Sequence, residues 1–219
     1  MNTAKQLKDS QVIDLELSKR THTLRSARDA ILQLRKEKEM LLAEVEKLKH
    51  FQGLAHEDPL SGLLNRRAFD KDVNIEIARA TRKLDYTFSI LLIDLNDFKQ
   101  INDQYGHAAG DKTIHWVAKF LKSQVRLQDS VYRLGGDEFA VLLPDTPSRG
   151  ARMVMGRIME VLALSNTARP FGIRMSMGAG TYKEDSLQVA NLLNIADKRM
   201  YQSKKLQKAA IKKHDTQPF

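Results

Sequence analysis

Two adjacent carboxylates follow two glycines in the run Arg133–Leu143, and such a turn is suited to holding charge. The flanking segments, 131–134 and 139–143, are apolar and β-prone, and Gly-Gly permits the positive φ angles of a tight hairpin. We therefore expect Asp137 and Glu138 at the hairpin tip. Neighbouring carboxylates repel each other, and Mg²⁺ carrying phosphates would offset that cost. An exposed polar turn is the alternative interpretation.

A third carboxylate, Asp94, ends the apolar run 89–93, which predicts a buried strand. This strand would deliver Asp94 close to Asp137, where the two could share Mg²⁺. A cap of a helix or turn is the alternative role for Asp94. A short helix is expected next, and the free backbone N–H groups at its start could bind phosphates. These groups belong to Asp97, Phe98 and Lys99.

Composition excludes several classes of site and of protein. The 219 residues contain no cysteine, which rules out disulfides, thiolate zinc sites and cysteine nucleophiles. No apolar run approaches the roughly 20 residues that span a bilayer, so we expect a cytoplasmic protein without membrane contact. The net charge of +9 suggests nucleic acid as a partner, yet no nucleic-acid signature accompanies it. The basic run from Lys198 to Lys213 contains no acid and suits either bound phosphates or a solvated helix face.

The first 50 residues lack glycine, proline and aromatic residues, which predicts a helix. Apolar residues within it alternate spacings of three and four, the pattern of a parallel dimeric coiled coil. The seam comprises Leu24, Ala27, Ile31, Leu34, Lys38, Leu41, Val45 and Leu48. A single amphipathic helix packed on its own domain is the alternative.

The remainder reads as an α+β head, with a break at Gly53–Pro59. Besides the hairpin, helices are expected at 65–84, 110–125, 147–164 and 186–207, and strands at 86–94 and 171–181. We assign residues 1–52 to a coiled-coil dimerisation and regulatory stalk, 53–210 to a catalytic domain and 211–219 to a basic, disordered tail.

Five further segments, together with the hairpin, resemble the GGDEF family of diguanylate cyclases. They occur in the family's order and spacing from Asp58 to about Ala210. The segments are 58–67, 94–103, 106–111, 176–179 and 196–201. The resemblance implies a nucleotidyl-cyclase-like palm, in which helices surround a central, mainly antiparallel sheet.

The resemblance also implies a set of site residues. Asp94, Asp137 and the carbonyl of Leu95 would bind Mg²⁺, or Mn²⁺ instead, and Asp137, Glu138 and Lys99 would serve catalysis. The residues expected to bind GTP are Asp97, Phe98, Lys99, Asn102, Asp111, Gly135, Gly136, Lys204 and Lys208. Asn102 and Asp111 would read guanine, because a carboxylate accepts from its N1–H and amino group.

The chain departs from the family's pattern at two places. Asn96 stands where many relatives carry Asp, and it lacks the charge of a good metal ligand. The family's usual Gly-Arg-Asn ending appears here as Gln207-Lys208-Ala209. Lys208 could replace the arginine charge but not its bidentate geometry.

Arg126 and Asp129 have the Arg-x-x-Asp spacing that resembles the family's product-inhibition site. Arg126 could bind phosphate or guanine while Asp129 accepts from the base edge. Arg157 matches a secondary contact expected from the neighbouring head. A chance pair in a helix-to-strand connection is the alternative.

The motifs and the resemblance together predict a homodimeric diguanylate cyclase that condenses two GTP into cyclic di-GMP and two pyrophosphate. We also expect cyclic di-GMP, the product, to inhibit the enzyme. A non-catalytic receptor for GTP or cyclic di-GMP is a second hypothesis, against which the intact Asp94 and Gly135–Glu138 argue. A nucleic-acid-binding helical protein is a third, which charge alone suggests.

Overall fold

The computed structural model describes residues 25–47, 56–166 and 172–215. The chain divides into two compact units, Met1–Gly53 and Leu54–Phe219. Within the described ranges, no helix combines the length and the apolar composition that crossing a membrane requires.

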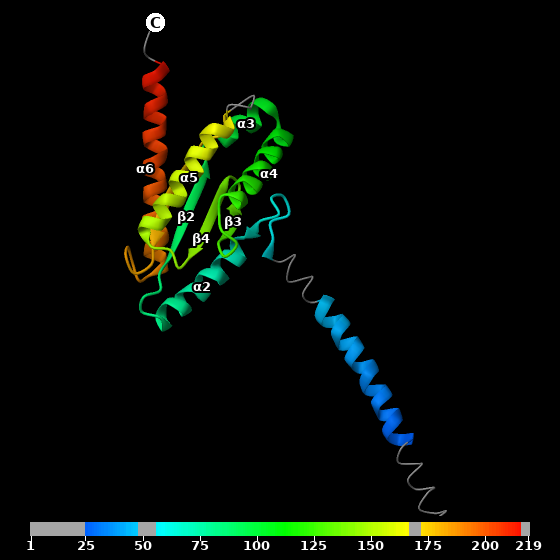
Figure 1. The fold of residues 1–219 in the computed structure, drawn as a ribbon. Coiled ribbons are helices and arrows are strands. Elements are labelled where there is room, and N and C mark those ends of the chain that lie inside the picture. Colours follow the sequence, from blue (N-terminus) through cyan, green and yellow to red (C-terminus); the bar gives the residue numbers. More distant parts are fainter. Residues whose placement is uncertain (1–24, 48–55, 167–171, 216–219) are drawn as a thin grey trace, which may run out of the picture. The chain divides into compact units, whose positions relative to one another are not determined.

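The described part of the first unit is a helix over residues 25–47 (Figure 1). The side chains of this helix are all exposed. Six predicted seam residues lie on it, from Ala27 to Val45, whereas Leu24 and Leu48 lie outside the described residues. Leu34 and Leu41 are 63% and 62% exposed. The helix therefore carries a stripe of exposed apolar side chains at heptad spacing.

In the part of the chain that the structure describes, the second unit, the head, is built on a five-stranded sheet in the order β1-β3-β4-β2-β5. Strands β2, β3 and β4 are labelled in Figure 1. Among the strands of the described residues, only the β1–β3 pair is parallel, so the predicted mainly antiparallel sheet is confirmed. The strands are β1 Leu64–Asn65, β2 Phe88–Leu95, β3 Ser130–Gly135, β4 Glu138–Pro144 and β5 Met175–Thr181.

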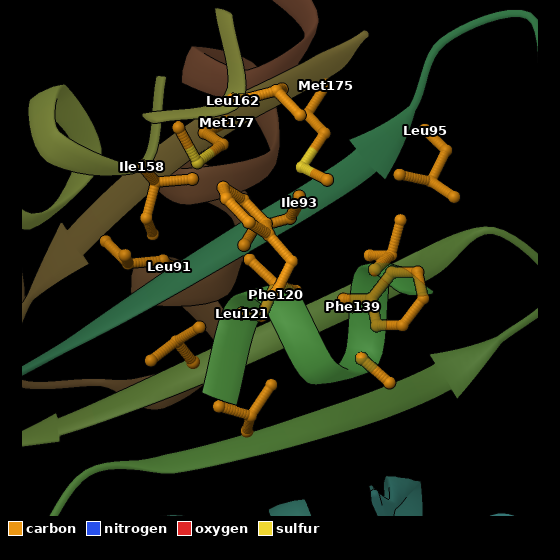
Figure 2. Packing of buried hydrophobic residues seen from close by; sticks show 14 of the residues in the cluster. Leu91, Ile93, Leu95, Phe120, Leu121, Phe139, Ile158, Leu162, Met175 and Met177 are labelled. Carbon is orange, nitrogen blue, oxygen red and sulfur yellow. The ribbon is translucent and has the colours of Figure 1, made fainter. Parts of the chain in front are cut away.

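Helices cover both faces of this sheet. The helices are α2 Arg66–Arg82, α3 Phe98–Tyr105, α4 His107–Ser123, α5 Ser148–Asn166 and α6 Val189–Asp215. Alternate residues of β2 enter two hydrophobic clusters, because side chains of a strand point to opposite faces in turn. Leu91 and Ile93 pack with α4 and α5 (Figure 2), whereas Phe88 and Ile90 pack with α2 and α6.

Some boundaries differ from the sequence-based expectation. Helix α4 begins at His107 rather than at residue 110, because Gly106, with φ of 81°, ends α3 and lets the next helix start at once. Strand β5 begins at Met175, and the expected start at Phe171 lies outside the described residues.

The prediction of a disordered tail at 211–219 is wrong over its first part. Helix α6 continues to Asp215. The segment from Ala209 to Asp215 contains no glycine or proline, and its alanines and lysines favour a helix. Residues 216–219 lie outside the described residues.

Helix α6 lies unusually close to strand β5. A Cβ atom added at Gly178 would stand 2.0 Å from the carbonyl oxygen of Ala196 and 2.3 Å from the amide nitrogen of Met200. Both contacts are backbone atoms, which cannot move aside as a flexible side chain can. Glycine at 178 therefore sets the distance between α6 and the sheet.

We predict that Gly178→Ala lowers the free energy of unfolding by roughly 1–3 kcal/mol or more, since the methyl group overlaps backbone that cannot yield. Urea unfolding of the full chain measures the effect. Gly156→Ala is the matched control: no atom lies within 4 Å of its added Cβ on the exposed side of α5. This control should raise stability by about 0.5–1 kcal/mol. Equal effects at both positions would contradict the close packing.

Candidate functional site

The pairing of β2 with β4 brings the predicted carboxylates to one edge of the sheet. Asp94 stands opposite Glu138 in the ladder, and the N–H of Leu95 donates to the carbonyl of Asp137 at 3.1 Å. Asp94 also stands opposite Ser176 of β5, the other neighbour of β2. Asp94, Leu95 and Asp137 are therefore neighbours although the hairpin and the strand are far apart in sequence.

The hairpin is held by its glycines and by one arginine. Gly135 and Gly136 have φ of 150° and 51°, which a residue with a Cβ rarely adopts. The guanidinium of Arg133 donates from Nε and Nη2 to the Gly136 carbonyl, at 3.0 and 2.7 Å. Its Nη1 donates to Asp58 Oδ1 at 2.9 Å. Arg133 thus ties the turn to the segment that opens the head, a role that the sequence did not indicate.

Asp94 has a cationic partner from the far end of the chain. Lys204 Nζ of α6 lies 2.5 Å from Asp94 Oδ1, and the two side chains are 27% and 15% exposed. Lys208 lies one turn further along α6 and is exposed. Glu138 pairs only loosely, since its carboxylate is 3.9 Å from Arg66 and both side chains are more than half exposed.

The two departures from the family's pattern meet in space. Asn96 is buried, and its Nδ2 donates to Gln207 Oε1 at 2.9 Å while its Oδ1 accepts from Ser176 Oγ at 2.9 Å. Gln207 Nε2 donates in turn to the Met175 carbonyl at 2.8 Å. This amide network joins the ends of β2 and β5 to α6, one turn beyond Lys204. The sequence indicated both residues as unusual but not that they are partners.

The start of α3 lies directly beyond this network. Asp97 precedes the helix and its side chain makes no capping hydrogen bond; it pairs instead with Arg174 Nη2 at 2.8 Å. Phe98, the first residue of α3, is half-buried and packs on the core, and Lys99 is exposed. Helix N-termini with free N–H groups attract anions.

The two residues expected to read guanine come from α3 and α4. A Cβ added at Gly110 would stand 1.9 Å from Asn102 Oδ1, so Asn102 lies against the residue that precedes Asp111. Asp111 is exposed on α4. Gly110 permits this close approach of the two helices, and the structure brings Asn102 near Asp111.

The Arg-x-x-Asp segment lies beside a hollow of about 490 Å³ that Arg126, Asp129 and Lys122 help to line. Asp129 Oδ2 accepts from the backbone N–H of Arg126 at 2.8 Å, whereas Asp129 Oδ1 is buried without a hydrogen-bond partner among the described residues. Burial raises the pKa of Asp129 despite both nearby arginines. An acceptor left unsatisfied in this way favours a ligand that donates a hydrogen bond.

Arg157 lies at this segment within its own chain. Its Nη2 donates to the carbonyl of Gln124 at 2.5 Å, two residues before Arg126. This contact brings α5 to the segment through the packing of the sheet, which the sequence could not show. That Arg157 contacts the site of a neighbouring head stays a prediction.

The carboxylates at the strand end fit Mg²⁺ rather than an all-protein metal cage. In the part of the chain that the structure describes, no three Asp, Glu, His or Cys side chains gather as metal ligands. Mg²⁺ commonly takes one or two carboxylates and completes its shell with waters and phosphates of a substrate. Two carboxylates and the Leu95 carbonyl at one edge form a donor set of this kind.

We predict that the Asp58–Arg133 pair makes the stability of the fold depend on pH in the acid range. Burial acts to raise the pKa of Asp58, but hydrogen bonds from Ser61 and Arg133 outweigh it and hold this pKa below 3.8. A carboxyl with a lowered pKa stabilises the fold above its ordinary pKa, and this contribution is lost as the pH falls through the folded-state pKa. Thermal unfolding between pH about 5 and about 2 measures the loss.

Asp58→Asn should flatten this part of the pH profile and lower the melting temperature at neutral pH. Asp85→Asn, at an exposed position, is the control and should leave the profile as it is. A profile that is the same in all three proteins would mean that the ion pair has no energetic weight.

Comparison with known proteins agrees with this geometry. The family described as diguanylate cyclase, GGDEF domain, matches residues 55–210. Diguanylate cyclase DgcS of Shewanella oneidensis is 33% identical over 147 residues, which cover 67% of this chain and 49% of DgcS. The chain spans 35–49% of the first three curated relatives that it matches.

Solved structures share the fold. The coiled coil and GGDEF domain of DgcB from Caulobacter crescentus, in complex with c-di-GMP, has a TM-score of 0.71 at 24% identity. The match covers 79% of this chain and 93% of that one. The GGDEF domain of DgcB alone, also with c-di-GMP, has a TM-score of 0.63 at 27% identity and covers 69% and 91%. Because the family match extends over residues 55–210, most of its length, this chain belongs to the GGDEF family.

Proposed function

We propose that this protein is a diguanylate cyclase that condenses two GTP into cyclic di-GMP and two pyrophosphate, as a homodimer with Mg²⁺. The observation that carries the proposal is the β2–β4 pairing, which sets Asp94 and Leu95 beside Asp137 in a family-matched head. The relative DgcS is named for this activity. GTP is an intracellular nucleotide, so a cytoplasmic location accompanies the proposal.

Asp94, Asp137 and the Leu95 carbonyl would hold Mg²⁺, with Mn²⁺ as an alternative. The ion supplies positive charge that stabilises the phosphates and the leaving pyrophosphate. Lys204, which pairs with Asp94 at 2.5 Å, is then free to turn toward the phosphates. Binding of substrate thus exchanges one ion pair for two, since Asp94 and Lys204 each gain a partner of opposite charge.

The remaining contacts to GTP would come from α3, α4 and α6. The backbone N–H groups of Asp97, Phe98 and Lys99 face the β- and γ-phosphates, as at other helix N-termini. Lys99 and Lys208 add exposed positive charge, Gly135 and Gly136 let the nucleotide approach the hairpin backbone, and Asn102 and Asp111 read the guanine edge.

The reaction needs two heads. Each GTP 3′-hydroxyl attacks the α-phosphorus of the other GTP, so that two O–P bonds form and two pyrophosphates leave. Glu138, exposed at the start of β4, would accept a hydroxyl proton, and Lys99 would offset the charge of the phosphates. One head holds only half of the reacting groups, so the two half-sites must be brought together.

The helix over residues 25–47 would provide that dimer. Its apolar stripe is exposed, and a second copy in parallel would bury it. Linking the heads in this way raises their effective concentration to about the millimolar range. The stalk would therefore belong to the mechanism as well as to regulation.

The hollow at Arg126 and Asp129 would bind cyclic di-GMP as an inhibitor. Guanine N–H groups would satisfy the buried Asp129 Oδ1, and Arg126 with Arg157 would meet phosphate or the base edge. The DgcB domain whose structure contains c-di-GMP is 27% identical to this chain.

We predict that Asp94→Asn and Asp137→Asn each reduce cyclisation by at least about a hundredfold, the scale of losing a group that acts on the transition-state charge. Fold and dimer should persist, since neither side chain belongs to the core. Purified protein is incubated with GTP and Mg²⁺, and the nucleotides are separated and identified. Near-normal turnover by either variant would place the metal elsewhere. Absence of cyclic di-GMP from the unmodified protein, with binding retained, would favour the receptor hypothesis.

We predict that Arg126→Ala relieves inhibition by cyclic di-GMP, because alanine cannot bind phosphate or the guanine edge. The initial rate without product should change little. Lys119→Ala, an exposed change on α4, is the control and should leave inhibition intact. Inhibition of equal strength in the Arg126 variant would show that the Arg-x-x-Asp pair serves the fold alone.

We predict that a chain beginning at residue 51 still binds one GTP per head but loses turnover at low protein concentration, since the half-sites then meet by diffusion. Rate against concentration is the measurement. An unrelated parallel dimeric coiled coil should restore the rate when it is joined to the head in the register of the native helix. A junction shifted by two or three residues should not, because each helical residue rotates the heads by roughly 100°. Full activity of the truncated chain when dilute would mean that the heads pair unaided.

A further inference from the structure

Asp97 has an unfavourable backbone conformation at the start of α3. Its φ and ψ are 60° and 25°, in the left-handed region, where a residue with a Cβ is rarely found. Aspartate tolerates this region better than most residues but still needs support from its surroundings. The conformation occurs between Asp94 and the first turn of α3, where the proposed phosphate contacts lie.

The same residue does not act as the helix cap that its type favours. An Asp at the N-cap normally has extended backbone and accepts from the N–H groups of the first turn. Here the Asp97 carboxylate makes no such bond. Among the described residues, the backbone N–H groups of Phe98 and Lys99 form no hydrogen bond, whereas those of Gln100 and Ile101 donate to the Asp97 carbonyl.

Arg174 holds the carboxylate in its alternative position. Its Nη2 lies 2.8 Å from Asp97 Oδ2, and the side chains are 46% and 22% exposed. The Arg174 backbone is itself fixed, because its carbonyl accepts from the N–H of Asn96 at 2.8 Å. The arginine is therefore anchored one residue from the aspartate that it pairs with.

We propose that Arg174 is a positioning residue that keeps the phosphate-binding N–H groups of α3 open, by drawing the Asp97 carboxylate away from them. Without Arg174, Asp97 relaxes to extended backbone and caps α3. Its negative charge then occupies the place of a phosphate oxygen and repels the triphosphate. The inference rests on the proposed function for the identity of the ligand, and tripolyphosphate binding, the first measurement below, does not depend on turnover.

The test uses the full chain and four variants: Arg174→Ala, Asp97→Gly, the double variant, and Arg149→Ala. Glycine at 97 accepts the left-handed conformation without strain and cannot cap the helix. Arg149 is exposed on α5, so its variant controls for the loss of one positive charge. Binding of inorganic tripolyphosphate is measured by calorimetry, and the amide resonances of Phe98 and Lys99 are followed by NMR. Turnover with GTP and Mg²⁺ gives KM and kcat separately.

Arg174→Ala should weaken tripolyphosphate binding and raise KM for GTP by about tenfold, the scale of one charge-assisted hydrogen bond. The kcat at saturating GTP should change little. The double variant should bind as Asp97→Gly does, because the capping carboxylate is gone. Arg149→Ala should match the unmodified protein.

Two results would overturn the proposal. If the double variant binds as weakly as Arg174→Ala, the arginine acts on the phosphates with its own charge. If Arg174→Ala binds as the unmodified protein does, with unchanged Phe98 and Lys99 resonances, the ion pair has no part in the site. If the unmodified protein binds tripolyphosphate but forms no cyclic di-GMP, the proposed function is contradicted. The binding results for the variants would still support or overturn this inference.

Discussion

The antiparallel register of β2 and β4 is the constraint on which the rest of the site depends. It sets Asp94 opposite Glu138 and the N–H of Leu95 on the carbonyl of Asp137. A slip of one residue would turn Asp94 toward the face that Leu91 and Ile93 fill, because side chains alternate along a strand. The burial of β2 between helices on both faces thus opposes any slip. The packing that stabilises the head is also what positions its carboxylates.

Around that edge, acidic side chains are paired with basic ones from distant elements. The pairs are Asp94–Lys204, Asp97–Arg174, Asp58–Arg133 and Glu138–Arg66. The more exposed of these pairs contribute little to stability, so their main effect is on geometry, whereas the largely buried Asp58–Arg133 pair acts on both. They hold the hairpin, the start of α3 and the last turns of α6 in fixed relation. The edge is therefore arranged before any ligand arrives.

The late basic run illustrates how one stretch of sequence takes several structural roles. Lys204 is committed to Asp94, and Lys205 Nζ lies 4.6 Å from the centre of the Tyr201 ring. Lys208, by contrast, is exposed. The basic run is therefore neither a uniform phosphate-binding surface nor a uniform solvated face. Neighbouring residues of a helix point in directions about 100° apart, so its lysines face different surroundings.

Much of the fold could be predicted because its signals are local. The Gly-Gly turn, the apolar run of β2 and the periodicity of the helices each reflect the conformational preferences of a few adjacent residues. These signals predicted the α+β head and the helix that includes residues 25–47, whereas the resemblance to the GGDEF family implied the mainly antiparallel sheet. The same signals predicted two helix boundaries wrongly. Gly106 lets α4 begin at His107, and alanines and lysines extend α6 to Asp215.

By itself, the sequence determined the types of element, the hairpin with its two carboxylates, and the candidates for the site. Only the tertiary structure decided the strand order β1-β3-β4-β2-β5 and the choice of partners among many charged and amide groups. Asn96 bonds to Gln207 across 111 residues of sequence, and Arg174 pairs with Asp97, whose backbone conformation is left-handed. Such partners carry no local signal. Any arginine or glutamine could serve equally well until the packing of sheet and helices brings one of them within hydrogen-bonding distance.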